Sequence, residues 1–272
     1  NVAAATCNGV SQAAGFACRS GSNTEFLTPQ VGVIFEPTQS QNYYVSYSSS
    51  AKPPGVSVGN GDTIAGSTPT TPGSADFDPE ESTNLEAGAR IGLFDDRMQL
   101  QGAIFQTRKE TAKENDPLGN ILRSGDSQEI TGLEIGVGGA ITDQWSITAN
   151  YTWLDTETTD SATAANIGKQ IAFTPEQAAS LWTTYNFLGG LEGLEVGGGL
   201  TYQGEVWLNA ANTGVSPSYT TLDGLVSYGF DRYRVSLNAY NLTDEVYFAQ
   251  VHGNRLTPGQ GRTFIATLGV VF

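Results

Sequence analysis

The sequence predicts an all-β protein, a transmembrane antiparallel β-barrel, and three observations support this prediction. About eleven segments of the 272-residue chain alternate apolar and polar residues with a period of two, which is the pattern of a strand with one apolar face. The connections between these segments alternate between short turns and long polar loops. Aromatic residues gather near the segment ends, and the three features together are typical of barrels that cross a membrane.

The composition favours strands and excludes two classes of protein. Gly, Ser, Thr, Asn and Tyr are abundant and only one Met is present, which favours strands and turns over helices. No window approaches the roughly 18 consecutive apolar residues that a membrane-spanning helix needs. Asp and Glu number 28 against 13 Lys and Arg, so the net charge is −15. This charge repels a phosphate backbone, and we expect no nucleic acid partner.

Residues 1–25 carry the only two cysteines, Cys7 and Cys18, in a stretch rich in Gly, Ala and Ser. Two cysteines at this spacing can close a short loop in an oxidising compartment, and such a disulfide stabilises by roughly 3 kcal/mol. A metal site would need more ligands than this region offers, whereas two free thiols would suit a cytosolic protein. We therefore expect residues 1–25 to form an extracellular loop with a Cys7–Cys18 disulfide. The chain starts at Asn1 without a Met, so either a leader was removed or the chain is a piece of a longer protein.

From Phe26 onward the predicted strands follow one another as hairpins. We expect strands at residues 31–35, 43–47, 85–93, 98–104, 133–141, 145–153, 179–187, 194–202, 222–230, 233–239 and 261–272. Short turns are expected at 37–41, 95–97, 142–144, 189–193 and 231–232, and long loops at 52–82, 113–128, 156–177, 204–218 and 247–261.

The last strand shows the alternation plainly. One face is uniformly apolar, and the other mixes small, polar and aliphatic residues. The apolar face consists of Phe264, Ala266, Leu268, Val270 and Phe272, and the other face of Thr263, Ile265, Thr267, Gly269 and Val271.

The residues on the second face of the predicted strands indicate whether the apolar face packs against a protein core or against lipid. A carboxylate would cost several kcal/mol in the dry core of a sandwich, whereas the polar lumen of a barrel accepts it. A soluble β-sandwich or lectin-like protein is the alternative. The residues predicted to point inward include Glu86, Arg90, Glu134, Glu195, Gln203, Asp223, Arg234 and Asn238. The aromatic residues near strand ends are Phe35, Phe94, Trp145, Tyr151, Trp153, Tyr185, Phe187, Tyr202, Tyr228, Phe230, Tyr233 and Phe272.

The strand count indicates an incomplete barrel. Short turns face the periplasm in such barrels, so the first and the last predicted strand both run toward the periplasm. An odd number of antiparallel strands cannot close edge to edge without a parallel pair. We expect this chain to be the C-terminal part of a larger barrel that begins inside an extracellular loop.

Seven segments carry a resemblance to a known family. They occur in the family's order from Phe26 onward, and their joint spacing is more specific than any one of them. The sequence resembles the barrel of TonB-dependent siderophore receptors. The segments are residues 28–38 (TPQVGVIFEPT), 47–54 (YSSSAKPP), 78–88 (DPEESTNLEAG), 132–134 (GLE), 150–155 (NYTWLD), 241–247 (NLTDEVY) and 258–262 (PGQGR), which leads to Phe272.

The resemblance implies a barrel of about 22 strands with an N-terminal plug domain, in the outer membrane of a Gram-negative bacterium. It implies import of ferric siderophore, with energy relayed through the plug by the TonB complex, and contact with outer-membrane lipid and lipopolysaccharide. Residues 26–272 would then be the C-terminal half of the barrel. The TonB box, the plug and the first half of the barrel have no counterpart in these residues, and the cargo could equally be cobalamin, haem or an oligosaccharide. Phe272 resembles the C-terminal aromatic residue that the barrel assembly machinery recognises.

Ligand is expected at the loops and inward residues near the outer rim, where aromatic, cationic and hydrogen-bonding groups can hold a chelate. A membrane-girdle role is the alternative for Trp207, Tyr247 and Phe248, and a solvated side chain is the alternative for His252. Arg262 is expected to serve barrel structure by pairing with an inward carboxylate. The candidate ligand-binding residues are Glu205, Trp207, Asn209, Tyr247, Phe248, His252, Asn254 and Arg255.

We expect neither a catalytic residue nor a resident cofactor or metal. No serine lies in a Gly-x-Ser-x-Gly elbow, and Glu80-Glu81 and Asp95-Asp96 are typical of loop and turn carboxylates rather than of an acid and base pair. The leading hypothesis is an uptake receptor. The alternative is a barrel that serves as a passive pore or an adhesive, structural surface without TonB coupling.

Overall fold

The structure is a computed structural model that describes residues 5–7, 10–11, 25–52, 63–64, 79–115, 121–252 and 255–270. For residues 5–7, 10–11, 63–64, 111–115, 121–126 and 252 it describes the backbone alone. Cys18, Asn254 and Phe272 therefore lie outside the described residues, as do the side chains of Cys7 and His252. The predicted disulfide and the predicted assembly signal remain predictions.

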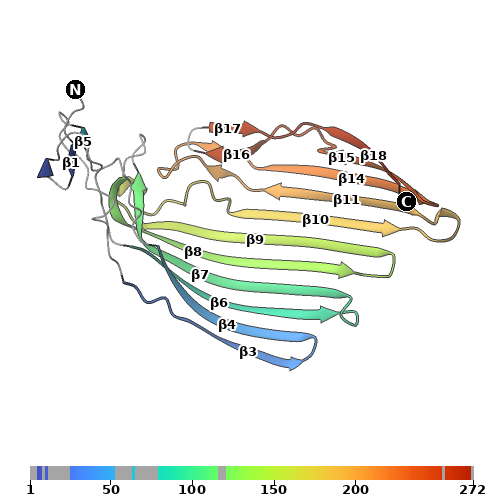
Figure 1. Ribbon diagram of the computed structural model, residues 1–272, viewed down its shortest axis with the longest axis horizontal. Helices are drawn as coiled ribbons and strands as arrows, with labels where there is room; N and C mark the ends of the chain where they lie inside the picture. Colours follow the sequence, from blue (N-terminus) through green and yellow to red (C-terminus); the bar gives the residue numbers. More distant parts are fainter. Residues whose placement is uncertain are drawn as a thin grey trace.

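One antiparallel sheet of eleven strands forms the body of the protein (Figure 1), which confirms the predicted fold class and strand count. Each strand pairs with the strands before and after it in the order β3-β4-β6-β7-β8-β9-β10-β11-β14-β15-β18. The strands are β3 (Gln30–Thr38), β4 (Gln41–Lys52), β6 (Glu80–Leu93), β7 (Met98–Asn115), β8 (Ile121–Ala140), β9 (Trp145–Asp160), β10 (Gln177–Asn186), β11 (Leu194–Gln203), β14 (Tyr219–Phe230), β15 (Tyr233–Tyr240) and β18 (Thr263–Val270).

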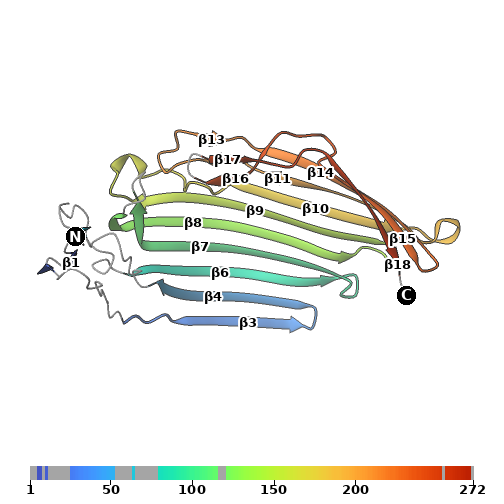
Figure 2. The same ribbon diagram turned by 45° about the horizontal axis from the view of Figure 1, so that its top comes forward.

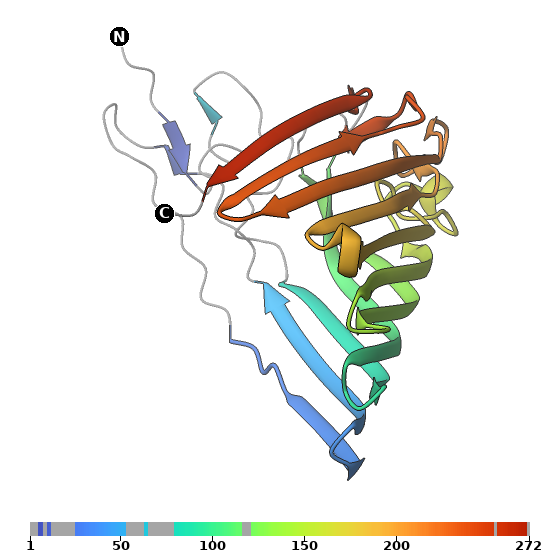
Figure 3. The same ribbon diagram turned by 90° about the vertical axis from the view of Figure 1, so that its right-hand side faces the viewer.

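The sheet curves into an open arc, which is part of a barrel (Figure 3). Within the described residues, β3 pairs only with β4, and β18 pairs only with β15. The two ends of the arc are therefore strand edges that carry unpaired backbone groups.

Short turns join the strands at one end of the sheet, and the long loops lie at the other end (Figures 1 and 2). Phe94, Asp95, Asp96 and Asp231 adopt positive φ angles of 55°, 57°, 62° and 54°, which tighten the turns after β6 and β14. Gly193 has φ 91°, and a Cβ there would lie 2.2 Å from the carbonyl oxygen of Gly229, so only glycine fits. The predicted turns are confirmed, except that β3 continues through Pro37 and Thr38 and its turn is residues 39–40.

The prediction of a loop at residues 113–128 was wrong, because β7 runs to Asn115 and β8 starts at Ile121. Beyond the membrane both faces of a strand meet water, so this part of the hairpin lacks the alternation that marks a strand in a sequence. Register shifts near Lys109 and Ser127 accompany this extension.

The other long loops contain small elements. The short strands β1 (Ala5–Cys7), β2 (Val10–Ser11) and β5 (Thr63–Ile64) form a separate sheet. Two hairpins, β12 (Val206–Trp207) with β13 (Val215–Ser216) and β16 (Phe248–His252) with β17 (Arg255–Pro258), lie in the last two loops. The described part of the chain also contains two 3₁₀ helices, η2 (Ala164–Asn166) and η3 (Gly189–Leu191). None of the helices in the described ranges has the length and hydrophobicity to span a membrane.

The apolar face of the sheet is its more exposed face. Val33 is 70% exposed and Leu268 66%, and among the described apolar residues only Val206 and Ala239 are buried. On β14 the apolar Leu222 and Val226 are exposed, whereas Thr221 and Ser227 of the opposite face are buried. Because the sheet is curved, apolar side chains on its convex side splay apart and polar side chains on its concave side crowd together. The apolar face is therefore the more exposed one. The convex apolar face is therefore the surface for lipid, and the concave face is the lumen.

Three large aromatic side chains on the inner face each lie over a glycine of the neighbouring strand. Tyr44 faces Gly88, Phe105 faces Gly132, and Trp182 faces Gly199 in direct cross-strand pairs. A Cβ on these glycines would lie within 2.2–2.6 Å of the ring atoms. Aromatic rings that cover strand glycines hide the bare backbone and fix the register of the hairpins.

Candidate functional site

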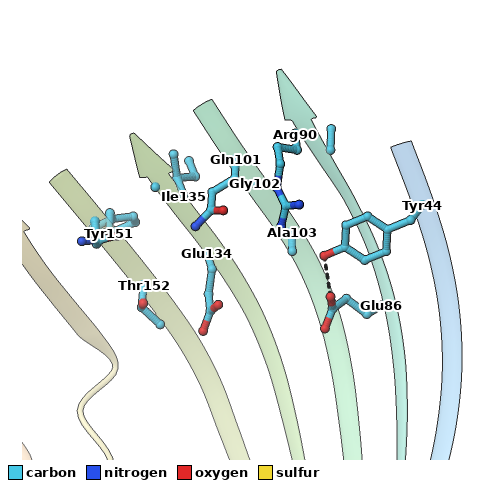
Figure 4. A pocket seen from close by; sticks show the side chains of 13 residues that line it. Tyr44, Glu86, Arg90, Gln101, Gly102, Ala103, Glu134, Ile135, Tyr151 and Thr152 are labelled. Atoms are coloured by element: carbon cyan, nitrogen blue, oxygen red, sulfur yellow. Dashed lines mark hydrogen bonds between the residues drawn. The ribbon is translucent and has the colours of Figure 1, made fainter. Parts of the chain in front are cut away.

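A polar hollow of about 240 Å³ lies in the inner face of β4 to β9 (Figure 4). The predicted inward residues Glu86, Arg90 and Glu134 line it together, which confirms their common face. The phenol of Tyr44 donates a hydrogen bond of 2.5 Å to Glu86 Oε1. Gln101, Asn150 and Thr152 complete the polar lining.

The charges of this hollow are only partly compensated. Tyr44 binds one carboxylate, but Arg90 and Glu134 make no hydrogen bond or ion pair with any other described residue. Unpaired charged groups of this kind are stable only where water or a polar partner reaches them. The hollow can therefore hold a hydrogen-bonding ligand or a polar protein segment.

A second inner cluster is paired within the sheet itself. Arg234 Nη1 lies 3.2 Å from Glu195 Oε2 and 3.2 Å from the hydroxyl oxygen of Ser227. Asp223 accepts a hydrogen bond of 2.8 Å from the backbone amide of Asn241. These residues were predicted to point inward, and their partners show that they stabilise the wall.

At the outer rim, the loop 161–176 is tied to the loop 204–218. Trp207 Nε1 donates a hydrogen bond of 2.6 Å to Gln170 Oε1, and the backbone amide of Phe173 donates one of 2.9 Å to the Trp207 carbonyl. Asn212 accepts from the Gln170 amide at 2.9 Å and donates to the Gln170 carbonyl at 3.0 Å. The two loops therefore form one layer of the rim.

The base of the last loop is closed by Asn241, which is 3% exposed. Its side-chain amide donates to the carbonyls of Glu245 at 2.8 Å and Gln260 at 3.0 Å, and its oxygen accepts from the Glu245 amide at 2.8 Å. Arg262 lies 3.8 Å from Asp244 in an exposed ion pair. Arg262 therefore pairs with a carboxylate of the loop base, and not with an inward carboxylate of a strand as predicted.

The predicted ligand-binding residues of the last loop are spread over its hairpin. The ring of Tyr247 lies 4.4 Å from that of Tyr219 and covers Gly259. Phe248 pairs with Pro258 at the base of the hairpin, and the backbone of His252 pairs with Arg255 near its tip. Arg255 is exposed.

The predicted residues of the preceding loop separate into one exposed side chain and two with structural contacts. Glu205 is exposed, whereas Trp207 is bound to Gln170. Asn209 donates to the hydroxyl of Thr213 at 3.0 Å and accepts from its amide at 3.1 Å, which shapes the tip of this loop. Among the described residues, no hydrogen bond, ion pair or ring contact joins the candidates of one loop to those of the other.

The predicted site residues do not include Tyr44, Gln101 and Asn150, which line the hollow. Their signal is present in the sequence, since each lies on the inward parity of a predicted strand. Which of them lie side by side depends on the pairing register, which alternation alone does not give.

The beta-barrel family of TonB dependent receptor-like proteins matches residues 8–242 of the chain. This chain belongs to the TonB-dependent receptor family. It is 35% identical over 263 residues to the probable TonB-dependent siderophore receptor PiuA of Acinetobacter baumannii, covering 92% of the chain and 34% of PiuA. It is 29% identical over 252 residues to the catecholate siderophore receptor Fiu of Escherichia coli K12, covering 89% of the chain and 32% of Fiu.

Solved structures of family members have the same fold. The crystal structure of PiuA matches with a TM-score of 0.78 at 33% identity, covering 92% of this chain and 36% of that one. The closed form of Fiu matches with a TM-score of 0.74 at 27% identity, covering 99% and 40%. The chain spans about a third of the length of these receptors. As a member of this family it is a barrel portion of an outer-membrane receptor.

Proposed function

We propose that this chain is the C-terminal half of the barrel of a receptor that imports a ferric siderophore across the outer membrane by TonB-coupled active transport. The observation that carries the proposal is the two-faced sheet, which is apolar outside and polar inside and matches the PiuA barrel. An apolar outer face suits lipid, and a polar lumen suits a hydrated chelate.

The remaining parts of the receptor follow from this proposal. The edges of β3 and β18 would pair with the other half of the barrel, and a plug domain that contacts TonB would occupy the lumen. Lipid and lipopolysaccharide would surround the apolar face. Glu205, Trp207, Asn209, Tyr247, Phe248, His252, Asn254 and Arg255 would contact chelate from the two rim loops, which are anchored at their bases by the contacts of Gln170 and Asn241.

The test is uptake by the full-length receptor in an Escherichia coli strain without its own catecholate receptors. The expected result is saturable uptake of radioactive iron dihydroxybenzoate that stops when the tonB gene is deleted. Uptake that is unchanged without TonB would identify a passive pore, and cell adhesion without any uptake would identify an adhesive barrel.

A further inference from the structure

One row of side chains crosses the inner face of eight consecutive strands. Each member is paired directly with the next across the neighbouring strands. All members but one are polar, and the exception is a glycine. We name this set the inner polar row, and it consists of Asn42, Arg90, Gln101, Gly136, Asn150, Ser180, Thr201 and Thr221.

The inner polar row runs from one end of the barrel wall to the other. Asn42 is the second residue of β4, which starts at the short turns, whereas Thr221 is the third residue of β14, which starts at the long loops. Strands in a barrel are tilted and staggered, so a line of direct cross-strand partners climbs along the barrel axis. The row therefore connects the periplasmic rim to the outer rim.

Three adjoining hollows follow the lower part of this row. The first, of about 250 Å³, is lined by Asn42 and Arg90 at the periplasmic rim. The second, of about 240 Å³, is lined by Arg90, Gln101 and Asn150, and the third, of about 180 Å³, by Gln101, Gly136 and Asn150. A Cβ at Gly136 would lie 3.0 Å from Gln101 Nε2 and 3.1 Å from Asn150 Oδ1, so both amides lie close to this glycine. The hollows share residues and form one groove.

Some polar side chains of the row have no partner in the sheet, whereas polar and aromatic side chains beside the row do. Gln101 and Thr201 are exposed and make no side-chain hydrogen bond with any described residue, and Asn150 reaches Ser180 only at 3.5 Å. Elsewhere on the inner face Trp182 covers Gly199, and Arg234 pairs with Glu195. The row thus offers free donors and acceptors at Arg90, Gln101 and Thr201, and its one charge is that of Arg90. At its two ends Asn42 donates a hydrogen bond of 2.9 Å to Glu36 Oε1, and Thr221 is buried.

We propose that the inner polar row is the track along which the hydrogen-bonding chelate passes through the barrel, an inference that rests on the proposed function. Passage requires binding that is favourable but weak and repeated at many sites, because tight binding at one site stops movement. Neutral amides and hydroxyls in succession provide such sites. The row is polar from one rim to the other, which a hydrogen-bonding solute that moves through the whole barrel requires.

The test compares two exposed inner-face threonines in the full-length receptor, Thr201 in the row on β11 and Thr267 outside it on β18. We expect Thr201→Leu to slow TonB-dependent uptake of iron dihydroxybenzoate about tenfold, because a leucine removes a hydrogen bond and narrows the track. Thr267→Leu should stay within about twofold of the wild type, and binding of the chelate to intact cells should be unchanged in both. Heat-modifiable migration in gels checks that both variants assemble.

A second pair of variants separates transport from folding. Thr201→Cys and Thr267→Cys, each with Cys7 and Cys18 replaced by Ser, are modified with a bulky hydrophilic maleimide after assembly, and only modification at position 201 should block uptake. Equal uptake by the two modified variants would overturn the proposal. Lower thermal stability of the Thr201→Leu receptor with normal uptake would also overturn it, because the row would then be covered by a fixed protein segment. No TonB-dependent uptake by the wild type would overturn the proposed function itself, and the inference with it.

Discussion

At the scale of single residues, glycine positions set how tightly the strands of the wall pack. Trp182 lies over Gly199, where an added Cβ would lie 2.3 Å from the Leu181 carbonyl oxygen and 2.6 Å from the indole ring. Gly102 differs, because its nearest neighbour, the Glu134 carbonyl oxygen, would be at 3.5 Å, an ordinary contact. Replacing these two glycines by alanine should therefore change the stability by different amounts, although in the sequence both are simply small residues within strands.

Gly199→Ala should therefore destabilise the assembled receptor by about 1–3 kcal/mol through overpacking. Gly102→Ala should be neutral or stabilising by a few tenths of a kcal/mol, since alanine restricts the unfolded chain. The measurement is the temperature at which heat-modifiable migration is lost, and equal shifts for the two variants would contradict the role of the Trp182 contact.

Asn241 closes the last loop with three hydrogen bonds, and its removal takes these partners from the backbone groups of Glu245 and Gln260. Asn241→Ala should cost about 1–3 kcal/mol and expose the loop 241–262 to protease on intact cells. Asn209→Ala serves as the control, because it removes only local bonds to Thr213 at an exposed loop tip. A loop that resists protease in both variants would refute the closing role of Asn241.

At the scale of elements, the loops 161–176 and 204–218 behave as one layer because side chains of the second bind the backbone and side chains of the first. The hydrogen bond from Trp207 Nε1 to Gln170 is the shortest of these contacts, at 2.6 Å. Trp207, which was predicted to bind ligand, therefore also joins the two loops.

Trp207→Phe keeps an aromatic ring but removes this donor, and it should cost about 1 kcal/mol. Backbone amides of the loop 161–176, that of Phe173 included, should then exchange hydrogen faster. Trp182→Phe is the matched control, since the indole of Trp182 donates no hydrogen bond to a described residue. Unchanged exchange in the Trp207 variant would show that the remaining Asn212 contacts hold the layer.

Two consecutive residues of strand β18 face opposite sides of the barrel wall. Ala266 belongs to the apolar outer face and Thr267 to the inner face. Ala266→Arg should destabilise the receptor in lipid by about 2–4 kcal/mol, whereas Thr267→Arg should have little effect, because only the first places a charge in hydrocarbon. Urea unfolding in phospholipid vesicles measures both, and a reversed order would mean that the two faces are assigned the wrong way round.

At the scale of the whole molecule, the two ends of the sheet face different compartments. The turn 187–193 lies at the short-turn end, and Ala210 lies in a long loop at the other end. In a receptor with Cys7 and Cys18 replaced by Ser, Ala210→Cys should react with a membrane-impermeant maleimide on intact cells, and Gly190→Cys should react only after the outer membrane is opened. The opposite labelling would reverse the orientation.

The sequence by itself determined the eleven strands, their short turns and the polarity of their faces, because lipid on one side and water on the other impose a period of two on every strand within the membrane. Where both sides meet water, as in the outer parts of β7 and β8, this signal is absent, and residues 113–128 were wrongly predicted to be a loop.

The tertiary structure decided which residues meet. Glu86 and Glu134 could be assigned to the lumen from parity, but their common hollow with Tyr44, Gln101 and Asn150 depends on the register of four strand pairings. Likewise, Asn241 and Arg262 belong to two of the seven segments that carry the family resemblance, but only the folded loop base shows their contacts with Glu245 and Asp244. Alternation is a local property of each strand, whereas register and loop closure join residues far apart in the chain, and the structure alone supplies them.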